Sequence, residues 1–413
     1  MANPGAEAVK PPAGSDARPS GRVEPGFEPL AEAFARMLGH GDRGGALVLL
    51  RGDRVLVDMR AGWADPDGLR PWDRDTQALG FSATKGLASM VLHRLADRGL
   101  LDYDEPVASF WPEFAAEGKG GITVRELMSH RAGLYDVQAV AFNARDLLDH
   151  EELENRLAAA RPRHAQGRPA YHAITYGWLA SGLARRVTGD GMRDLIRTEL
   201  AEPLGTAGLE LGLPARRPAP ILGSSLRLYS SLGAAATPLL GWLPVTRAGF
   251  RALHAPGFES LCRGSDPAIW HAEMPAVNGA LSAEGLARLY APLANRGEAR
   301  GERFLSPQTV EELGRVQTRG LDRVLGVRMR WRLGLHHAFG VRHRAPRALG
   351  HYGFGGCGGW GDPDTGISFG FVSNHIGTLT TVLGDFGILR LAGLARSCAE
   401  RLEGPNHHPE LQG

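Results

Sequence analysis

Near the start of the chain, hydrophobic and polar positions alternate in patterns typical of regular secondary structure. Residues 27–40 place apolar side chains at helical spacing, which predicts a helix. Residues 45–52 and 54–64 are two strand-like runs, and Arg51-Gly52-Asp53 between them supplies a hairpin turn. We therefore expect one helix followed by a β-hairpin.

From about residue 81 to residue 320 the pattern becomes helical and rich in loops. Apolar spacing predicts helices at 82–98, 123–130, 173–188 and 282–296. Thr123 is followed three residues later by Glu126, which is the pattern of a capping box, and Ser282 is the expected N-cap of the last of these helices. Asn278-Gly279, just before that helix, predicts a turn.

The last part of the chain returns to strand-like sequence. Candidate strands lie at 348–354, 367–374 and 376–383, and a helix is expected at 385–402. Strands at both ends of the chain and helices between them predict an α/β (α+β) fold, in which one antiparallel sheet forms from the two ends and a helical insertion walls a cleft.

The expected organisation divides the chain into one folded unit and two tails. Residues 26–80 and 321–403 are assigned to the sheet subdomain, and residues 81–320 to the helical subdomain. Residues 1–25 are rich in Pro, Gly, Ala and charge and offer nothing to bury, so we expect a disordered tail there. Residues 404–413 are a second tail.

Composition excludes several classes of protein. The chain has 413 residues, 43% of them hydrophobic and 22% charged, as in an ordinary globular protein. A net charge of +2 and the lack of a basic stripe give no reason to expect a nucleic-acid partner. Almost all the positive charge is Arg, since the lysines are Lys10, Lys85 and Lys119. The scarcity of lysine draws attention to Lys85.

Cysteine usage and the lack of long apolar segments bear on location. Cys262, Cys357 and Cys398 are widely spaced and odd in number, which is typical of a reducing compartment. No signal peptide and no membrane-spanning stretch are evident in the sequence. A cytoplasmic location without an integral membrane segment is therefore the expectation, and the oligomeric state stays open.

The first chemical motif is Ser82-Ala83-Thr84-Lys85, an S-x-x-K at the start of a predicted helix. A spacing of three places both side chains on one helix face. The positive end of the helix dipole favours a developing alkoxide on Ser82. A serine hydroxyl needs a neighbouring base to become nucleophilic, and a partly buried lysine supplies one because desolvation lowers its pKa. The competing interpretation is an N-cap serine beside a surface lysine.

This motif in its context resembles the nucleophile helix of serine β-lactamases and penicillin-binding proteins, and within them the class C branch with its carboxylesterases. The resemblance covers roughly residues 28–400 and includes segments 101–107, 122–134, 185–189 and 199–205. It implies a β-lactamase-like fold, a catalytic Ser82 and Lys85, and no cofactor or metal ion.

The second motif of that branch is Tyr-x-Asn, and Tyr171-His172-Ala173 stands in its place. The resemblance implies that Tyr171 shares proton transfer with Lys85, and we expect the neighbouring ammonium to lower the pKa of the phenol. Ala173 departs from the pattern, because the Asn amide that would hold an acyl amide and help to place the lysine is missing. Tyr176 is the competing phenol, although its position inside the predicted helix favours packing.

The third motif of the family is Lys-Thr-Gly, and His351-Tyr352-Gly353 falls where it is expected. His351 and Tyr352 bind a substrate carboxylate poorly, which favours neutral esters, and His351 is a candidate partner for Tyr171 or the leaving group. A structural histidine is the alternative. The resemblance implies that Gly353 lets the backbone approach the substrate, and that the N–H groups of Ser82 and Phe354 form the oxyanion hole.

Two glycine patterns point to other folds and fail their structural tests. Gly353, Gly355 and Gly358 spell G-x-G-x-x-G, but no helix follows them, so a tight connection between strands is expected in place of a dinucleotide site. Residues 366–370 spell the G-x-S-x-G of α/β-hydrolases. Ser368, however, sits in a strand pattern with too little chain beyond it for the remaining catalytic residues.

Together these features predict a serine carboxylesterase, a lipase-like hydrolase of small-molecule esters, that acts through an acyl-enzyme on Ser82. The alternatives are an acyltransferase of the same fold, a β-lactamase or D,D-peptidase, and a catalytically silent scaffold. Residues 228–246 are uncharged and are broken by Pro238 and Gly241; ordinary burial, an acyl-pocket wall and lipid contact are all open interpretations.

Overall fold

The computed structural model describes residues 17–38, 43–222, 244–263, 266–340, 343–376 and 386–403. All of the expected strand at 376–383 except its first residue, and most of the uncharged segment 228–246, lie outside these ranges. All structural statements below refer to the described residues.

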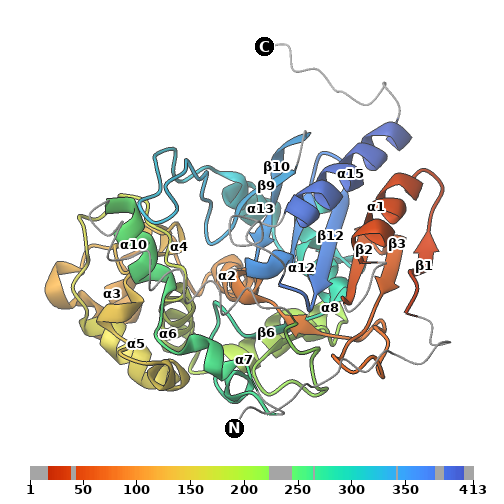
Figure 1. Cartoon of the computed structure of the whole chain (residues 1–413). Coiled ribbons are helices and arrows are strands. Elements are labelled where there is room, and N and C mark those ends of the chain that lie inside the picture. The colour runs from red at the N-terminus through yellow and green to blue at the C-terminus, as the bar shows by residue number, and fades with distance from the viewer. Residues whose placement is uncertain are drawn as a thin grey trace, which may run out of the picture.

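A seven-stranded antiparallel sheet in the order β1-β3-β2-β12-β11-β10-β9 joins the two ends of the chain (Figure 1). Its strands are β1 (Ser20–Val23), β2 (Gly45–Arg51), β3 (Arg54–Ala61), β9 (His336–Gly340), β10 (His343–Tyr352), β11 (Gly358–Asp362) and β12 (Ile367–Ser373). The pairing of β2 with β12, from Gly45↔Ser373 to Arg51↔Ile367, is where the N-terminal and C-terminal strands meet. The predicted sheet built from both chain ends is confirmed.

Helices cover both faces of this sheet. α1 (Glu28–Leu38) and α15 (Phe386–Glu403) lie side by side on one face, where Phe34 packs edge-on against Phe371 (Figure 1). α12 (Ala283–Ala294) covers the opposite face, against β2, β11 and β12. Two hydrophobic cores result, one under α1 and α15 and a larger one that continues from α12 into the helical region.

The helical region lies beside the sheet and is built mostly of short elements. α2 (Thr84–Asp97) packs against α6 (Tyr176–Thr188), and α6 packs against α5 (His150–Ala159). The remaining helices are α3 (Val107–Phe110), α4 (Val124–Met128), α7 (Met192–Leu195), α8 (Glu202–Leu204), α10 (Pro244–Leu253), α11 (Phe258–Leu261) and α13 (Pro307–Gly314). Short strands form two minor sheets, β4 (Ala78–Leu79) with β6 (Gly279–Leu281) and β5 (Leu209–Leu211), and β7 (Glu298–Ala299) with β8 (Glu302–Arg303).

Most predicted elements form, with ends shifted by a few residues. The capping box is present, since Thr123 accepts from the Glu126 N–H and Glu126 accepts from the Thr123 N–H. Ser282 caps α12 through the Gly285 N–H at 2.9 Å. Ser20–Val23, expected to belong to a disordered tail, instead form edge strand β1 by pairing with β3. α12, which falls inside the predicted helical subdomain, packs against the sheet.

The glycine-rich stretch after β10 is also more regular than predicted. The expected tight connection is present at Gly353 and Gly355, between β10 and β11. Gly358, also assigned to it, instead begins β11, an unpredicted strand between β10 and β12. A Cβ on Gly361 would lie 2.2 Å from the Tyr290 carbonyl oxygen of α12, and one on Gly359 would lie 2.6 Å from the Phe369 oxygen. These glycines are therefore required because α12 and the neighbouring strand approach the backbone so closely.

Gly370 of β12 tests this packing. A Cβ there would lie 2.0 Å from the Ala283 carbonyl oxygen and 2.7 Å from the Ala287 nitrogen, and backbone atoms of a helix cannot move aside cheaply. We expect Gly370→Ala to lower the free energy of unfolding by about 1–3 kcal/mol, measured by urea denaturation. Gly121→Ala is the matched control, because its Cβ meets nothing within 4 Å, and should change stability by less than about 0.5 kcal/mol.

Candidate active site

The turn before α2 places Ser82 at a strained corner of the chain. Phe81, the preceding residue, has φ +44°, a left-handed conformation that bulky residues rarely adopt. Its ring packs edge-on against Phe354, with centroids 5.5 Å apart. Ser82 follows in a short 3₁₀ turn, η1 (Phe81–Ala83), that leads directly into α2. Strain that is held in place by packing is a common feature of functional sites.

The structure brings the three predicted catalytic side chains into hydrogen-bond contact. The Nζ of Lys85 lies 3.0 Å from the Oγ of Ser82, as the S-x-x-K spacing predicts. The phenol of Tyr171 donates to the same Oγ at 2.9 Å, although Tyr171 is 89 residues away along the chain. Tyr176 instead pairs with Ser89, at 2.7 Å, so it is Tyr171 that reaches the serine.

Lys85 is fully buried, and backbone carbonyls hold its amine. Nζ donates to the Ala173 oxygen and, at 3.3 Å, to the Ala276 oxygen. No carboxylate in the described ranges pairs with it, and burial lowers the pKa of Lys85 well below its usual value. The amide missing at Ala173 is thus not needed to place the lysine, because the main chain of that same residue binds the amine.

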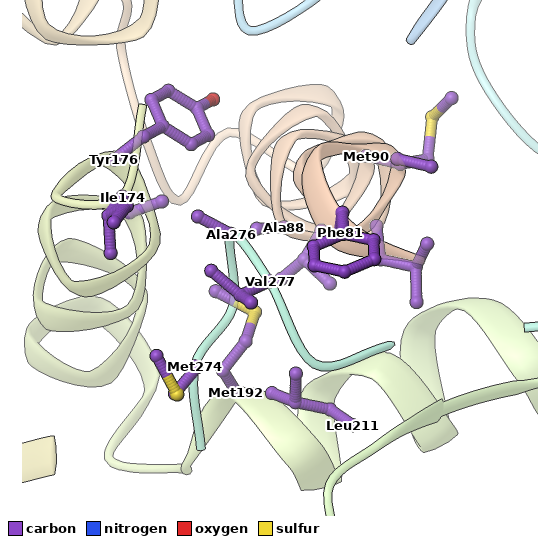
Figure 2. Close-up of a cluster of buried hydrophobic side chains, with 14 of the residues drawn as sticks. Phe81, Ala88, Met90, Ile174, Tyr176, Met192, Leu211, Met274, Ala276 and Val277 are labelled. Carbon is purple, nitrogen blue, oxygen red and sulfur yellow. The ribbon is translucent and has the colours of Figure 1, made fainter. Parts of the chain in front are cut away.

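The loop that supplies the Ala276 carbonyl lies between α2 and α6, where Ala276 and Val277 pack among the buried side chains of both helices (Figure 2). Asn278 is fully buried and holds this loop: its side chain donates to the Ile269 and Ala272 oxygens and accepts from the Met274 N–H. The turn predicted at Asn278-Gly279 lies slightly earlier, at residues 275–277, and Gly279 begins β6. Asn278 is a structural support for one partner of Lys85.

Tyr171 is buried as well, and its electrostatics differ from the expectation. Burial raises the pKa of the phenol far above its usual value, and the hydrogen bond with Ser82 offsets only part of this. The predicted lowering of the Tyr171 pKa by a neighbouring ammonium is therefore wrong, because burial of the phenol outweighs the effects that lower its pKa. Tyr171 is accordingly a protonated donor in the free protein.

Buried, uncharged histidines surround this group. His130 packs against the ring of Tyr171 at 5.0 Å, and its Nδ1 accepts from the His172 N–H at 3.3 Å. The ring of His351 lies 6.3 Å from that of Tyr171, and its Nδ1 contacts the Tyr352 oxygen at 2.8 Å. Burial lowers the pKa of His130 and His351 well below the usual value, so both are neutral.

His351 makes no hydrogen bond to Tyr171 among the described contacts. A carbonyl only accepts, so the Nδ1 facing Tyr352 carries the proton and Nε2 keeps its lone pair. Nε2 is buried and has no partner within the described ranges. Whether His351 contacts a substrate stays a prediction.

Gly353 brings the end of β10 against the nucleophile turn. A Cβ at this position would lie 2.2 Å from the Gly80 oxygen and 3.1 Å from the Ala83 nitrogen. A side chain at Gly353 would therefore collide with the nucleophile turn. The expected approach of the Gly353 backbone to a substrate stays a prediction. Phe354 follows at once and touches Phe81, but the oxyanion-hole role of the Ser82 and Phe354 N–H groups stays a prediction.

Two residues that support Tyr171 were not predicted. Trp331 stacks on its ring, with centroids 5.1 Å apart, and Asp322 accepts from its backbone N–H at 3.2 Å. Nothing in the sequence near Asp322 or Trp331 signals this, since both belong to an irregular segment 151 or more residues from Tyr171. His130, by contrast, lies in segment 122–134, already singled out by the resemblance.

Ser368, the serine of the G-x-S-x-G pattern, is buried in β12 opposite Leu50 and Gly361. Within the described ranges no group of three or more His, Cys, Asp or Glu side chains is arranged to hold a metal ion. Among the described helices, none combines the length and apolarity that a membrane crossing requires.

Comparisons with known proteins agree on one family. A family model described as Beta-lactamase matches residues 30–393. The chain is 41% identical over 394 residues to Esterase/beta-lactamase LipL of Mycobacterium tuberculosis, which covers 94% of this chain and 90% of the relative. A solved family VIII carboxylesterase has a TM-score of 0.80 at 34% identity, and a penicillin-binding-protein homologue from Caulobacter crescentus has 0.77 at 30%; each comparison covers 92% of this chain and 99% of the other.

The geometry around Lys85 predicts how the reactivity of Ser82 depends on pH. Below the pKa of Lys85 the amine is protonated and cannot accept the serine proton, whereas above that pKa it is a free base. We expect the rate of Ser82 labelling by a fluorophosphonate probe to rise with pH through that pKa. Lys85→Met should abolish the rise, and Ser368→Ala, which changes a buried strand residue, should preserve it. Labelling of Ser82 at a pH-independent rate would contradict Lys85 as the base.

Proposed function

The chain belongs to the β-lactamase family, and we propose that it is a serine hydrolase that cleaves carboxylic esters through an acyl-enzyme on Ser82. The observation that carries the proposal is the convergence of the Lys85 amine and the Tyr171 phenol on one serine oxygen. The relatives named as an esterase/β-lactamase and a family VIII carboxylesterase support the same chemistry.

In the first step Lys85 acts as the base. A neutral amine has two N–H groups and one lone pair; the Ala173 and Ala276 carbonyls take the two N–H groups, which leaves the lone pair for the Ser82 hydroxyl. Ser82 Oγ attacks the ester carbonyl while its proton passes to Lys85. The charge that develops on the carbonyl oxygen needs backbone donors, for which the Ser82 and Phe354 N–H groups are the candidates.

In the second step Tyr171 supplies the proton that the leaving alcohol requires. Its phenol is protonated and already points its O–H at the Ser82 oxygen, beside the bond that breaks. The ammonium formed on Lys85 restores that proton, so the pair ends with Lys85 neutral and Tyr171 protonated. Water then attacks the acyl-enzyme and gives its proton through the same pair back to Ser82.

Neutral esters fit this site better than anionic substrates. His351 and Tyr352 occupy the place of the family's Lys-Thr-Gly, and His351 is uncharged because burial lowers its pKa. A substrate carboxylate would therefore lack the ammonium that Lys-Thr-Gly offers it. The cytoplasmic location expected from the sequence stays a prediction.

The proposal is tested by hydrolysis of p-nitrophenyl butyrate by the wild type, Ser82→Ala and Ser368→Ala proteins. We expect at least about a 10³-fold loss of kcat/KM in Ser82→Ala, since removal of a nucleophile disables its whole catalytic unit. Ser368→Ala should retain activity. Folded wild type that is inert toward esters but opens nitrocefin would favour the β-lactamase alternative. If an alcohol is added and more butyryl groups are transferred to that alcohol than are released as butyrate, the acyltransferase alternative is favoured.

A further inference from the structure

Asp322 is a fully buried carboxylate in the irregular segment between α13 and β9, and four N–H groups point at it. Oδ1 accepts from the backbone N–H groups of Tyr171, Val324 and Leu325 at 3.2, 2.9 and 3.0 Å. Oδ2 accepts from the indole Nε1–H of Trp331 at 2.9 Å. Hydrogen bonds to an ionised group are stronger than neutral ones, which favours a single fixed geometry here.

Through these bonds Asp322 holds Tyr171 at two points. The first is the main chain, where the Tyr171 N–H donates directly to Oδ1. The second is the side chain, because Trp331 lies nearly parallel to the Tyr171 ring, with an interplanar angle of 10° and centroids 5.1 Å apart. Trp331 is itself buried, and His130 packs edge-on against it at 4.4 Å. The phenol is thus placed between a fixed backbone and a fixed aromatic plane.

We propose that Asp322, acting through Trp331, is a positioning residue that aims the Tyr171 phenol at Ser82. The inference rests on the proposed role of Tyr171 as the proton donor to the leaving alcohol. A displacement of the phenol by about 1 Å is enough to weaken proton transfer strongly. Lys85, by contrast, is held by the Ala173 and Ala276 carbonyls and does not depend on Asp322.

The charge of Asp322 acts in the same direction as its geometry. Burial is the main cause that raises the Tyr171 pKa, and the nearby Asp322 carboxylate adds to it by disfavouring the phenolate. Both effects keep the phenol protonated and ready to donate. Neither effect involves the amine of Lys85.

Asp322→Asn separates the two attachments. The remaining side-chain oxygen still accepts from the three backbone N–H groups, but the new NH₂ group then faces the Trp331 N–H, and two donors cannot pair. The variant should therefore fold with its local turn intact and release the tryptophan under Tyr171. Trp331→Phe is the companion variant, because it removes the indole N–H and leaves a smaller ring in the stack.

The test compares kcat/KM for two butyrate esters that form the same acyl-enzyme. p-Nitrophenolate leaves without a proton, whereas ethoxide needs one, so a misplaced proton donor slows ethyl butyrate more than p-nitrophenyl butyrate. For Asp322→Asn we expect the loss with ethyl butyrate to exceed the loss with the aryl ester by about tenfold, a fraction of what general acid catalysis contributes. A purely structural defect lowers both equally. If Asp322→Asn gives no folded protein, Trp331→Phe is judged by the same criterion.

Two further variants interpret the result. Asp362→Asn alters another buried carboxylate, at the end of β11, which pairs with Arg396 of α15 at 2.9 Å. This variant should leave the ratio of kcat/KM for the two esters unchanged. Tyr171→Phe, which removes the proton donor itself, should lower kcat/KM for ethyl butyrate relative to p-nitrophenyl butyrate at least as much as Asp322→Asn does. If Tyr171→Phe shows this selective loss and Asp322→Asn does not, positioning by Asp322 is overturned and the proposed function stands. If Tyr171→Phe lacks it too, the proton-donor role fails and the inference fails with it.

Discussion

The site depends on the burial of one amine without a counter-charge. Lys85 lies wholly inside the protein, with carbonyl oxygens but no carboxylate in the described ranges as partners. An ammonium there would be costly, so burial lowers the pKa of the amine and favours its action as a base for the adjacent serine. A paired carboxylate would have stabilised the ammonium and removed that basicity. The absence of an ion pair at this point is therefore a condition of the chemistry.

The fold keeps water and charge away from that amine by packing helices in layers. α12 presses against the sheet so closely that Gly359, Gly361 and Gly370 have no room for a side chain. α2 lies on α12 in turn, and a Cβ on Gly86, next to Lys85, would be 2.1 Å from the Tyr290 hydroxyl oxygen. The loop at Ala276, whose carbonyl accepts from the amine, lies between α2 and α6 (Figure 2). Glycines at the contacts make this depth of burial possible.

The predictions from sequence succeeded where one local pattern carried the information. The S-x-x-K spacing gave the Ser82–Lys85 contact, and the capping pattern at Thr123 gave the start of α4. They failed where a distant neighbour decides. β11 was missed because its sequence is rich in glycine, which the close approach of α12 requires and which is not typical of a strand. β1 was missed because its four residues form a strand only by pairing with β3. The shift of the Tyr171 pKa was predicted in the wrong direction, because the motif Tyr171-His172-Ala173 does not show how deeply the phenol is buried.

The sequence by itself determined the family resemblance, which rests on matched motifs, and the sheet built from both ends of the chain, which follows from hydrophobic periodicity. The S-x-x-K spacing also determined that Ser82 and Lys85 lie together. Only the tertiary structure decided the direction of the pKa shifts of Lys85, Tyr171 and His351, because a pKa depends on surroundings contributed by remote segments. It also decided that the backbone of Ala173, and not a side chain there, holds the lysine, and that Asp322 and Trp331 support Tyr171. Such contacts join residues far apart in the chain, so no pattern within the sequence records them.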